Sequence, residues 1–126
     1  MEIALIPCSK LKTDRPCPAR ELYAPSRLFS LSYQYARLNA DKVCILSAKY
    51  GLVEESDVIA PYDLILADLP EYRQRDWANY VLTQMGEWFD LERDTFLILA
   101  GPTQSGERDS GERHVTEAGV GRNPFG

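Results

Sequence analysis

Two short segments carry most of the side chains that could do chemistry, and each follows an apolar run. The first is Pro7-Cys8-Ser9-Lys10-Leu11-Lys12, and the second is Ser47-Ala48-Lys49-Tyr50. Together they contain a thiol, two hydroxyl groups, a phenol and three of the four lysines of the chain. Backbone N–H groups after a strand can hold a phosphate, and nearby lysines add positive charge. The two segments therefore predict a binding site for an anion or a nucleotide, unless their lysines simply face water.

Apart from the lysines, few side chains of the sequence are candidates for catalysis or metal binding. A nucleophilic Cys8 would need an activating base, and the only histidine, His114, lies far along the chain, so we expect a buried thiol instead. Cys8, Cys17 and His114 have no familiar zinc-ligand spacing, so we expect no metal site, and no motif requires a cofactor. Asp63 follows Pro61-Tyr62 and could act as a base or hold an amine near the lysines. The alternative is that these three residues form a plain turn.

Three apolar runs are expected to form the strands that position these residues. They span 2–6, 43–46 and 95–100, and each is too short for a helix. A strand–helix–strand unit of this kind normally forms a right-handed parallel crossover. The predicted fold is therefore a small α/β domain with a mainly parallel sheet of at least three strands and helices packed on it.

Two helices are expected between the strands. The first opens at Pro25, and the residues that recur at the spacing of one helix face are Leu28, Leu31, Tyr35 and Leu38. The second opens at Pro70, and the residues expected to form its core face are Trp77, Val81, Met85 and Trp88. Because ligands bind at the carboxyl edge of open α/β sheets, we expect the site there. The ligand-binding residues expected from these segments are Cys8, Ser9, Ser47, Lys49, Tyr50 and Tyr62.

Composition restricts the classes of protein. The net charge of −5 argues against indiscriminate nucleic-acid binding, but residues 1–50 carry a balance of +4 and residues 51–126 a balance of −9. No apolar run approaches the roughly 18 residues that span a bilayer, and no signal pattern is present, so we expect a cytoplasmic protein without a membrane partner. Three cysteines without a signal predict reduced thiols.

The sequence predicts one domain followed by a tail. Residues 1–102 are expected to form the α/β domain. Residues 103–126 are rich in glycine and poor in aliphatic side chains, so we expect a flexible tail, or one ordered by a partner protein or a second copy of the chain.

Four motifs together resemble a family of small bacterial and phage proteins that is distantly similar to the YaaA family of DNA-binding peroxide-stress proteins. They are Ile6–Lys10, Leu22–Ser26, Leu46–Leu52 and Pro61–Asp63, and the resemblance covers about residues 3–101. The first two also resemble the archaeosine synthase pattern Pro-Cys-x3-Lys followed by Pro-Tyr-x2-Ser-x2-His. The matching residues are Pro7, Cys8, Lys12, Tyr23 and Ser26, whereas Leu22 and Phe29 replace the proline and the histidine.

The resemblance to archaeosine synthase implies chemistry on a nucleobase, with Lys12 as the candidate nucleophile and Lys10 as its cationic neighbour. It also implies that Tyr23 and Ser26 belong to the ligand-binding residues. Asp63 completes the predicted catalytic set. Three functions remain open on this basis. The first is an enzyme that modifies a nucleobase, a nucleotide or a nucleic acid, the second is a non-catalytic module that binds such ligands, and the third is a structural interaction domain.

Overall fold

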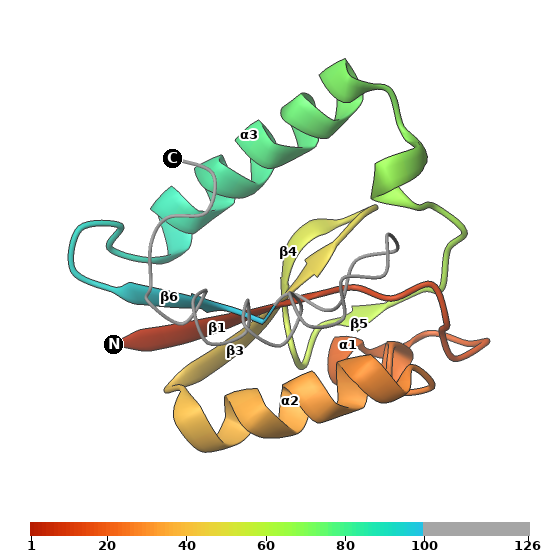
Figure 1. Ribbon diagram of the computed structural model, residues 1–126, viewed down its shortest axis with the longest axis horizontal. Coiled ribbons are helices and arrows are strands. Elements are labelled where there is room, and N and C mark those ends of the chain that lie inside the picture. The colour runs from red at the N-terminus through yellow and green to blue at the C-terminus, as the bar shows by residue number, and fades with distance from the viewer. Residues whose placement is uncertain (100–126) are drawn as a thin grey trace, which may run out of the picture.

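The computed structural model describes residues 1–99 (Figure 1). The glycine-rich segment 103–126 and Ala100, the expected end of the third strand, lie outside the described residues.

Within residues 1–99 the chain forms a four-stranded sheet and helices, which confirms the predicted α/β class. In the strand order β4-β3-β1-β6, β1 is parallel to β3 and β6, and β4 is antiparallel to β3. The strands of this sheet are β1 (Glu2–Pro7), β3 (Lys42–Ser47), β4 (Gly51–Glu54) and β6 (Thr95–Ile98). The helices are α1 (Ala19–Leu22), α2 (Arg27–Asn39), the 3-10 helix η1 (Leu66–Asp68) and α3 (Glu71–Trp88). A small antiparallel pair joins β2 (Cys17–Pro18) to β5 (Val58–Ile59).

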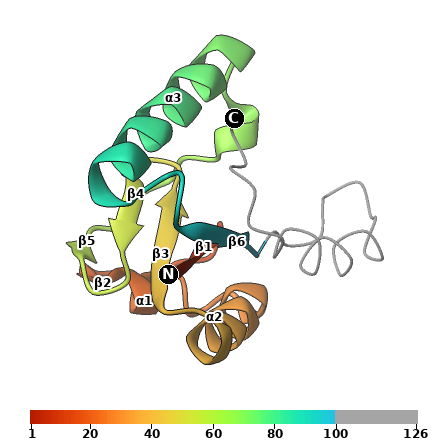
Figure 2. The same cartoon turned by 90° about the vertical axis from the view of Figure 1, so that its left-hand side faces the viewer.

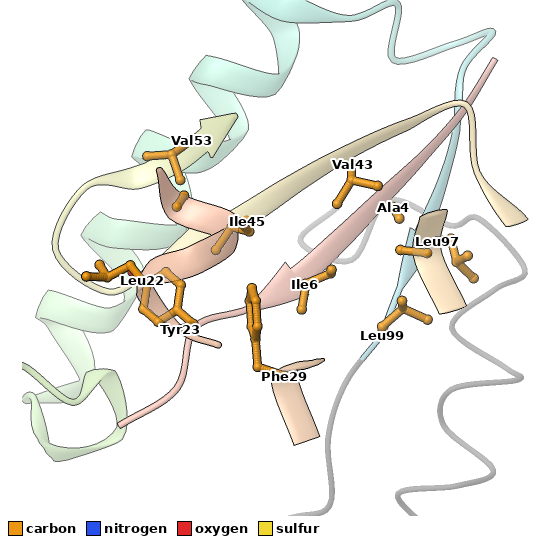
Figure 3. Close-up of a cluster of buried hydrophobic side chains, with 12 residues drawn as sticks. Ala4, Ile6, Leu22, Tyr23, Phe29, Val43, Ile45, Val53, Leu97 and Leu99 are labelled. Carbon is orange, nitrogen blue, oxygen red and sulfur yellow. The ribbon is translucent and has the colours of Figure 1, made fainter. Parts of the chain in front are cut away.

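The sheet lies between two helices. Helix α2 covers one face, and α3 covers the other (Figure 1, Figure 2). On the α2 side, the inner strands β1 and β3 contribute the buried residues Ala4, Ile6, Val43 and Ile45 (Figure 3). On the α3 side they contribute the alternate residues Ile3, Leu5, Cys44 and Leu46. Because the side chains of a strand alternate between its faces, burial on both sides explains why these two apolar runs are continuous.

Helix α2 begins at Arg27, two residues later than expected, because the Ser26 hydroxyl accepts the N–H of Phe29 and caps the first turn. The apolar face predicted for this helix is wrong. Phe29 and Ala36 are buried, whereas the predicted residues Leu28, Leu31, Tyr35 and Leu38 are exposed. Neighbouring residues are about 100° apart around a helix, so a shift of one position turns each of these side chains away from the sheet.

Helix α3 begins directly after Pro70, as predicted, and buries Val81 and Met85. Trp88, predicted on the same face, is instead 37% exposed. The next residue, Phe89, takes the expected place against the core, with its ring 5.9 Å from that of Phe96. The helix ends at Trp88, so the extended backbone after it brings Phe89 to the sheet.

Gly51 turns the chain from β3 into β4, an antiparallel strand that the sequence pattern did not predict. Its φ of 77° lies in the left-handed region that favours glycine. The side-chain amide of Gln84 in α3 accepts the N–H of Leu52 at 2.7 Å and donates to the Leu52 carbonyl at 3.0 Å. These two bonds satisfy backbone groups on the outer edge of β4 and hold the turn against α3.

Candidate functional site

The loop at the end of β1, Pro7–Lys10, lies against the turn at the end of β3, Ser47–Tyr50. The N–H of Cys8 donates to the carbonyl of Leu46 at 2.9 Å, and the N–H of Ala48 donates to Cys8 Sγ at 3.3 Å. The two segments singled out in the sequence therefore meet at the carboxyl edge of the parallel strands, which confirms that they are adjacent.

Four side chains beside this contact form a group that we call the tyrosine cluster: Tyr23, Ser47, Tyr50 and Tyr62. The Tyr62 hydroxyl lies 2.7 Å from the Tyr23 hydroxyl and accepts a hydrogen bond from Ser47 Oγ at 2.9 Å. Ser47 Oγ also accepts the backbone N–H groups of Lys49 and Tyr50 at 3.2 and 3.0 Å. The Tyr50 ring packs edge-on against Tyr62, with the centroids 5.6 Å apart. The cluster thus ties the end of α1 and the end of β3 to the segment that leads into η1.

Both inner phenols of the cluster titrate at high pH. Burial raises the pKa of Tyr23 to about 12, although hydrogen bonds with Ser47 and Tyr62 oppose the shift. Burial also raises the pKa of Tyr62, and the neighbouring Cys8 adds to that increase. At neutral pH these phenols therefore stay protonated, so they serve as hydrogen-bonding groups and not as bases.

Lys12 lies over the tyrosine cluster. Its Nζ is 4.3 Å from the ring centroid of Tyr62 and 5.9 Å from that of Tyr23. The same Nζ donates to the carbonyl of Lys10 at 3.3 Å. Lys12 therefore makes cation–π contacts with both rings and a hydrogen bond within its own loop.

Two cavities open on either side of the Pro7–Lys10 loop, and all four residues of this loop line both. Cavity A has a volume of about 460 Å³, and its other walls come from Leu46, Ala48, residues 64–67, Trp77 and Ile98. Cavity B has a volume of about 320 Å³, and its other walls come from Ile6, Ser26, Leu28, Phe29, Ser32 and Leu99.

The structure brings most of the predicted site residues together. Those that line both cavities are Cys8, Ser9 and Lys10, while Ser26 lines cavity B alone. Those that form the tyrosine cluster or lie over it are Lys12, Tyr23, Ser47, Tyr50 and Tyr62. The predicted residues thus fall into two adjoining groups, one around the cavities and one beside them.

Lys49 and Asp63 are exposed and line neither cavity. Lys49 Nζ lies 5.3 Å from the ring centroid of Tyr50. Within residues 1–99 neither side chain forms an ion pair. A role for either residue therefore requires a ligand that extends beyond the two cavities.

Sequence reasoning missed part of the cavity walls. It assigned Trp77 to the core, but this half-buried side chain lines cavity A, and its Nε1 donates to the carbonyl of Ser47 at 2.9 Å. The indole N–H of a buried tryptophan usually has a hydrogen-bond acceptor, and this requirement was the signal in the sequence that Trp77 lies near polar groups. Ser32 and residues 64–67 were also missed, and no motif marks them.

The described part of the chain was also searched for metal sites and membrane spans. Within residues 1–99, no three His, Cys, Asp or Glu side chains are grouped so that they could hold a metal ion. No helix in this range combines the length and the apolar character needed to cross a bilayer. His114 lies outside the described residues.

The raised pKa values predict weaker stability in alkali. Tyr23 titrates at about 12 in the folded protein and at 10.0 when unperturbed, so between these pH values the unfolded chain releases a proton that the folded one keeps. The free energy of unfolding should therefore fall as pH rises through this window. Burial raises the pKa of Cys44 from 9.0 to about 12, so this thiol should also lower the free energy of unfolding as the pH rises above about 9. Urea denaturation at a series of pH values checks this, and Tyr23→Phe should decline less steeply between pH 10 and 12. A stability that rises over this range would contradict it.

Comparison with known proteins shows which family the chain belongs to. No curated protein and no solved structure matches the chain. One family model matches residues 3–107, which include both segments at the carboxyl edge and the tyrosine cluster. Since this match covers most of the chain, the protein belongs to that family of unknown function, DUF6884.

Proposed function

We propose that the protein binds a ligand that carries a nucleobase, and that cavity A holds the base. The position of cavity A carries this proposal, because the cavity lies at the carboxyl ends of β1, β3 and β6 and against the Pro7–Lys10 loop. Open α/β sheets bind nucleotides at this edge, in the crevice where the strand order reverses. Here β1 leads through α2 to β3 on one side, and β6 lies on its other side.

The walls of cavity A suit a flat, largely apolar ring system. Its volume of about 460 Å³ falls in the usual range for small-molecule sites, about 300–1,000 Å³. The strand ends contribute Leu46 and Ile98, and α3 contributes the indole of Trp77. Aromatic rings in contact gain both buried area and favourable offset or edge-to-face geometry. A purine or a pyrimidine would therefore find apolar contact on both the sheet side and the helix side.

The charge around the cavities favours a neutral or anionic ligand. Among the described residues that line cavity A or cavity B, Lys10 is the one with a charged side chain, and none is a carboxylate. A cationic ligand would therefore meet repulsion without compensation. The protein as a whole is acidic, with a net charge of −5. Attraction of an anion to the cavities would therefore depend on the local positive charge of Lys10.

Covalent chemistry on the base is the alternative. The resemblance of the Pro7–Lys12 segment to archaeosine synthase favours Lys12 as a nucleophile and a purine or deazapurine as its target. A nucleophile must reach the base, however, and Lys12 Nζ lies over the rings of Tyr62 and Tyr23 and donates to the Lys10 carbonyl. Lys12 also lines neither cavity. The arrangement therefore supports binding of a base more than its modification.

A calorimetric titration against purine, deazapurine and pyrimidine nucleosides tests the proposal, with ribose and inorganic phosphate as controls. At least one nucleoside should bind with a Kd between about 1 μM and 1 mM, which corresponds to roughly 4–8 kcal/mol. Ribose and phosphate should bind far more weakly, because neither fills an apolar cavity. If no nucleoside binds better than ribose, the base-binding proposal is wrong.

A further inference from the structure

We infer that the ligand is a nucleotide whose base occupies cavity A, whose phosphate occupies cavity B and whose sugar crosses the Pro7–Lys10 loop. This inference rests on the proposed function and adds a second subsite to it. It assigns a role to cavity B, which base binding alone does not use.

The two cavities are separated by little more than one loop. Pro7, Cys8, Ser9 and Lys10 line both of them. At the end of β6, the consecutive residues Ile98 and Leu99 line cavity A and cavity B respectively. Side chains of consecutive extended residues point to opposite faces of a sheet, so the two cavities lie on opposite faces of the sheet at the carboxyl ends of β1 and β6. A ligand with two parts joined by a short link can fill both.

Cavity B offers hydroxyl groups that can donate to an anion. Ser26 Oγ accepts the N–H of Phe29 at 3.2 Å, which leaves its own O–H available as a donor. Ser32 is half-buried in the wall of cavity B, and within residues 1–99 its hydroxyl makes no hydrogen bond. The third hydroxyl, that of Ser9, already donates to the Leu11 carbonyl at 2.8 Å. Two O–H donors therefore remain for a ligand.

Cavity A lacks such donors. The indole N–H of Trp77 already donates to the Ser47 carbonyl, and the Cys8 thiol, whose Sγ accepts the N–H of Ala48, has only a weak S–H donor. The remaining walls are mainly aliphatic. The chemical division between the cavities thus matches the division of a nucleotide into an apolar ring and a polar anion. Lys10 lines both cavities and can pair with the phosphate from the shared loop.

Calorimetric titration of the 5′-monophosphates of adenosine, guanosine, cytidine and uridine beside the parent nucleosides tests this inference. For the base that binds, the monophosphate should bind at least about tenfold tighter than its nucleoside, because it adds charge-assisted contacts. Lys10→Met should remove about tenfold of monophosphate affinity, and Ser32→Ala about threefold. Ser32→Ala, which changes a residue that lines cavity B and not cavity A, should leave nucleoside affinity within about twofold of the parent protein.

Lys42→Met is the matched charge control. Lys42 lies at the amino end of β3, where it pairs with Glu54 at 3.6 Å, and it lines neither cavity A nor cavity B. It should leave monophosphate affinity unchanged. The inference is overturned if nucleoside and monophosphate bind equally well, if Ser32→Ala has no effect, or if Lys42→Met weakens binding as much as Lys10→Met. Base binding in cavity A would survive each of these results, whereas a failure of every nucleoside and nucleotide to bind would remove both proposals.

Discussion

Replacing Gly51 by alanine should lower the free energy of unfolding by roughly 2–5 kcal/mol. The φ of 77° at this position is strained for any residue with a side chain. An added Cβ would also lie 2.5 Å from Gln84 Oε1 and 2.7 Å from Tyr80 Cε2, both too close. Relief would have to displace the amide of Gln84 from the backbone of Leu52. Urea denaturation of the purified variant measures the effect.

Gly86→Ala provides a control of opposite sign. Gly86 lies inside α3 with helical backbone, and an added Cβ would meet only Leu91 Cδ1 at an ordinary 3.7 Å. Alanine should therefore stabilise the protein by about 0.5–1 kcal/mol. Equal effects of the two substitutions would contradict the assignment of a special backbone conformation and a close contact to Gly51.

Ala67→Trp should abolish base binding, reducing affinity by about a hundredfold or more, because the new indole would occupy cavity A. Ala67 belongs to η1, is exposed and lines this cavity. Since its side chain takes no part in the buried core, the free energy of unfolding should change by less than about 1 kcal/mol. Titration with the best-binding nucleoside and urea denaturation together measure both effects.

Ala24→Trp is the control for that substitution. Ala24 is also exposed, but it lines neither cavity. The same large side chain placed there should leave nucleoside affinity unchanged. If Ala67→Trp keeps the full affinity of the parent protein, the base does not lie in cavity A.

The parallel strands and their edge were predictable because they depend on local sequence. The runs 2–6 and 43–46 are apolar at every position after Glu2, and the structure buries both faces of β1 and β3. Once the two strands are parallel neighbours, the segments that follow them must meet at one edge. The contact between Cys8 and Ala48 therefore follows from the parallel arrangement of β1 and β3, which the apolar runs predicted.

The face of α2 and the strand β4 were not predictable in the same way. The spacing of Leu28, Leu31 and Leu38 is as regular as that of the residues that are buried, so periodicity could not choose between adjacent faces. Strand β4 depends on pairing with β3 and on Gln84, which lies 32 residues after Leu52. Such long-range partners leave no local pattern.

The sequence predicted which segments meet at the candidate site, but it did not predict the walls of the cavities. Tyr23 and Tyr62 were singled out as ligand-binding residues, yet they hydrogen-bond each other and lie beside the cavities. The walls come from residues 64–67 and Trp77, whose positions depend on how the chain returns to the sheet before α3. A cavity is a product of packing, and no single motif describes it.

The most direct test of base binding in cavity A uses the two tryptophans of the chain. Trp88→Phe leaves Trp77 as the single indole, in the wall of cavity A, while Trp77→Phe leaves Trp88, which lines a separate hollow with Met1 and Lys42. Titration of a nucleoside that binds by calorimetry should quench the fluorescence of Trp77 in the first variant, because the base would lie against the indole. The fluorescence of Trp88 in the second variant should not change. Calorimetric binding with no response from Trp77, or a response from Trp88 alone, would contradict the placement of the base in cavity A.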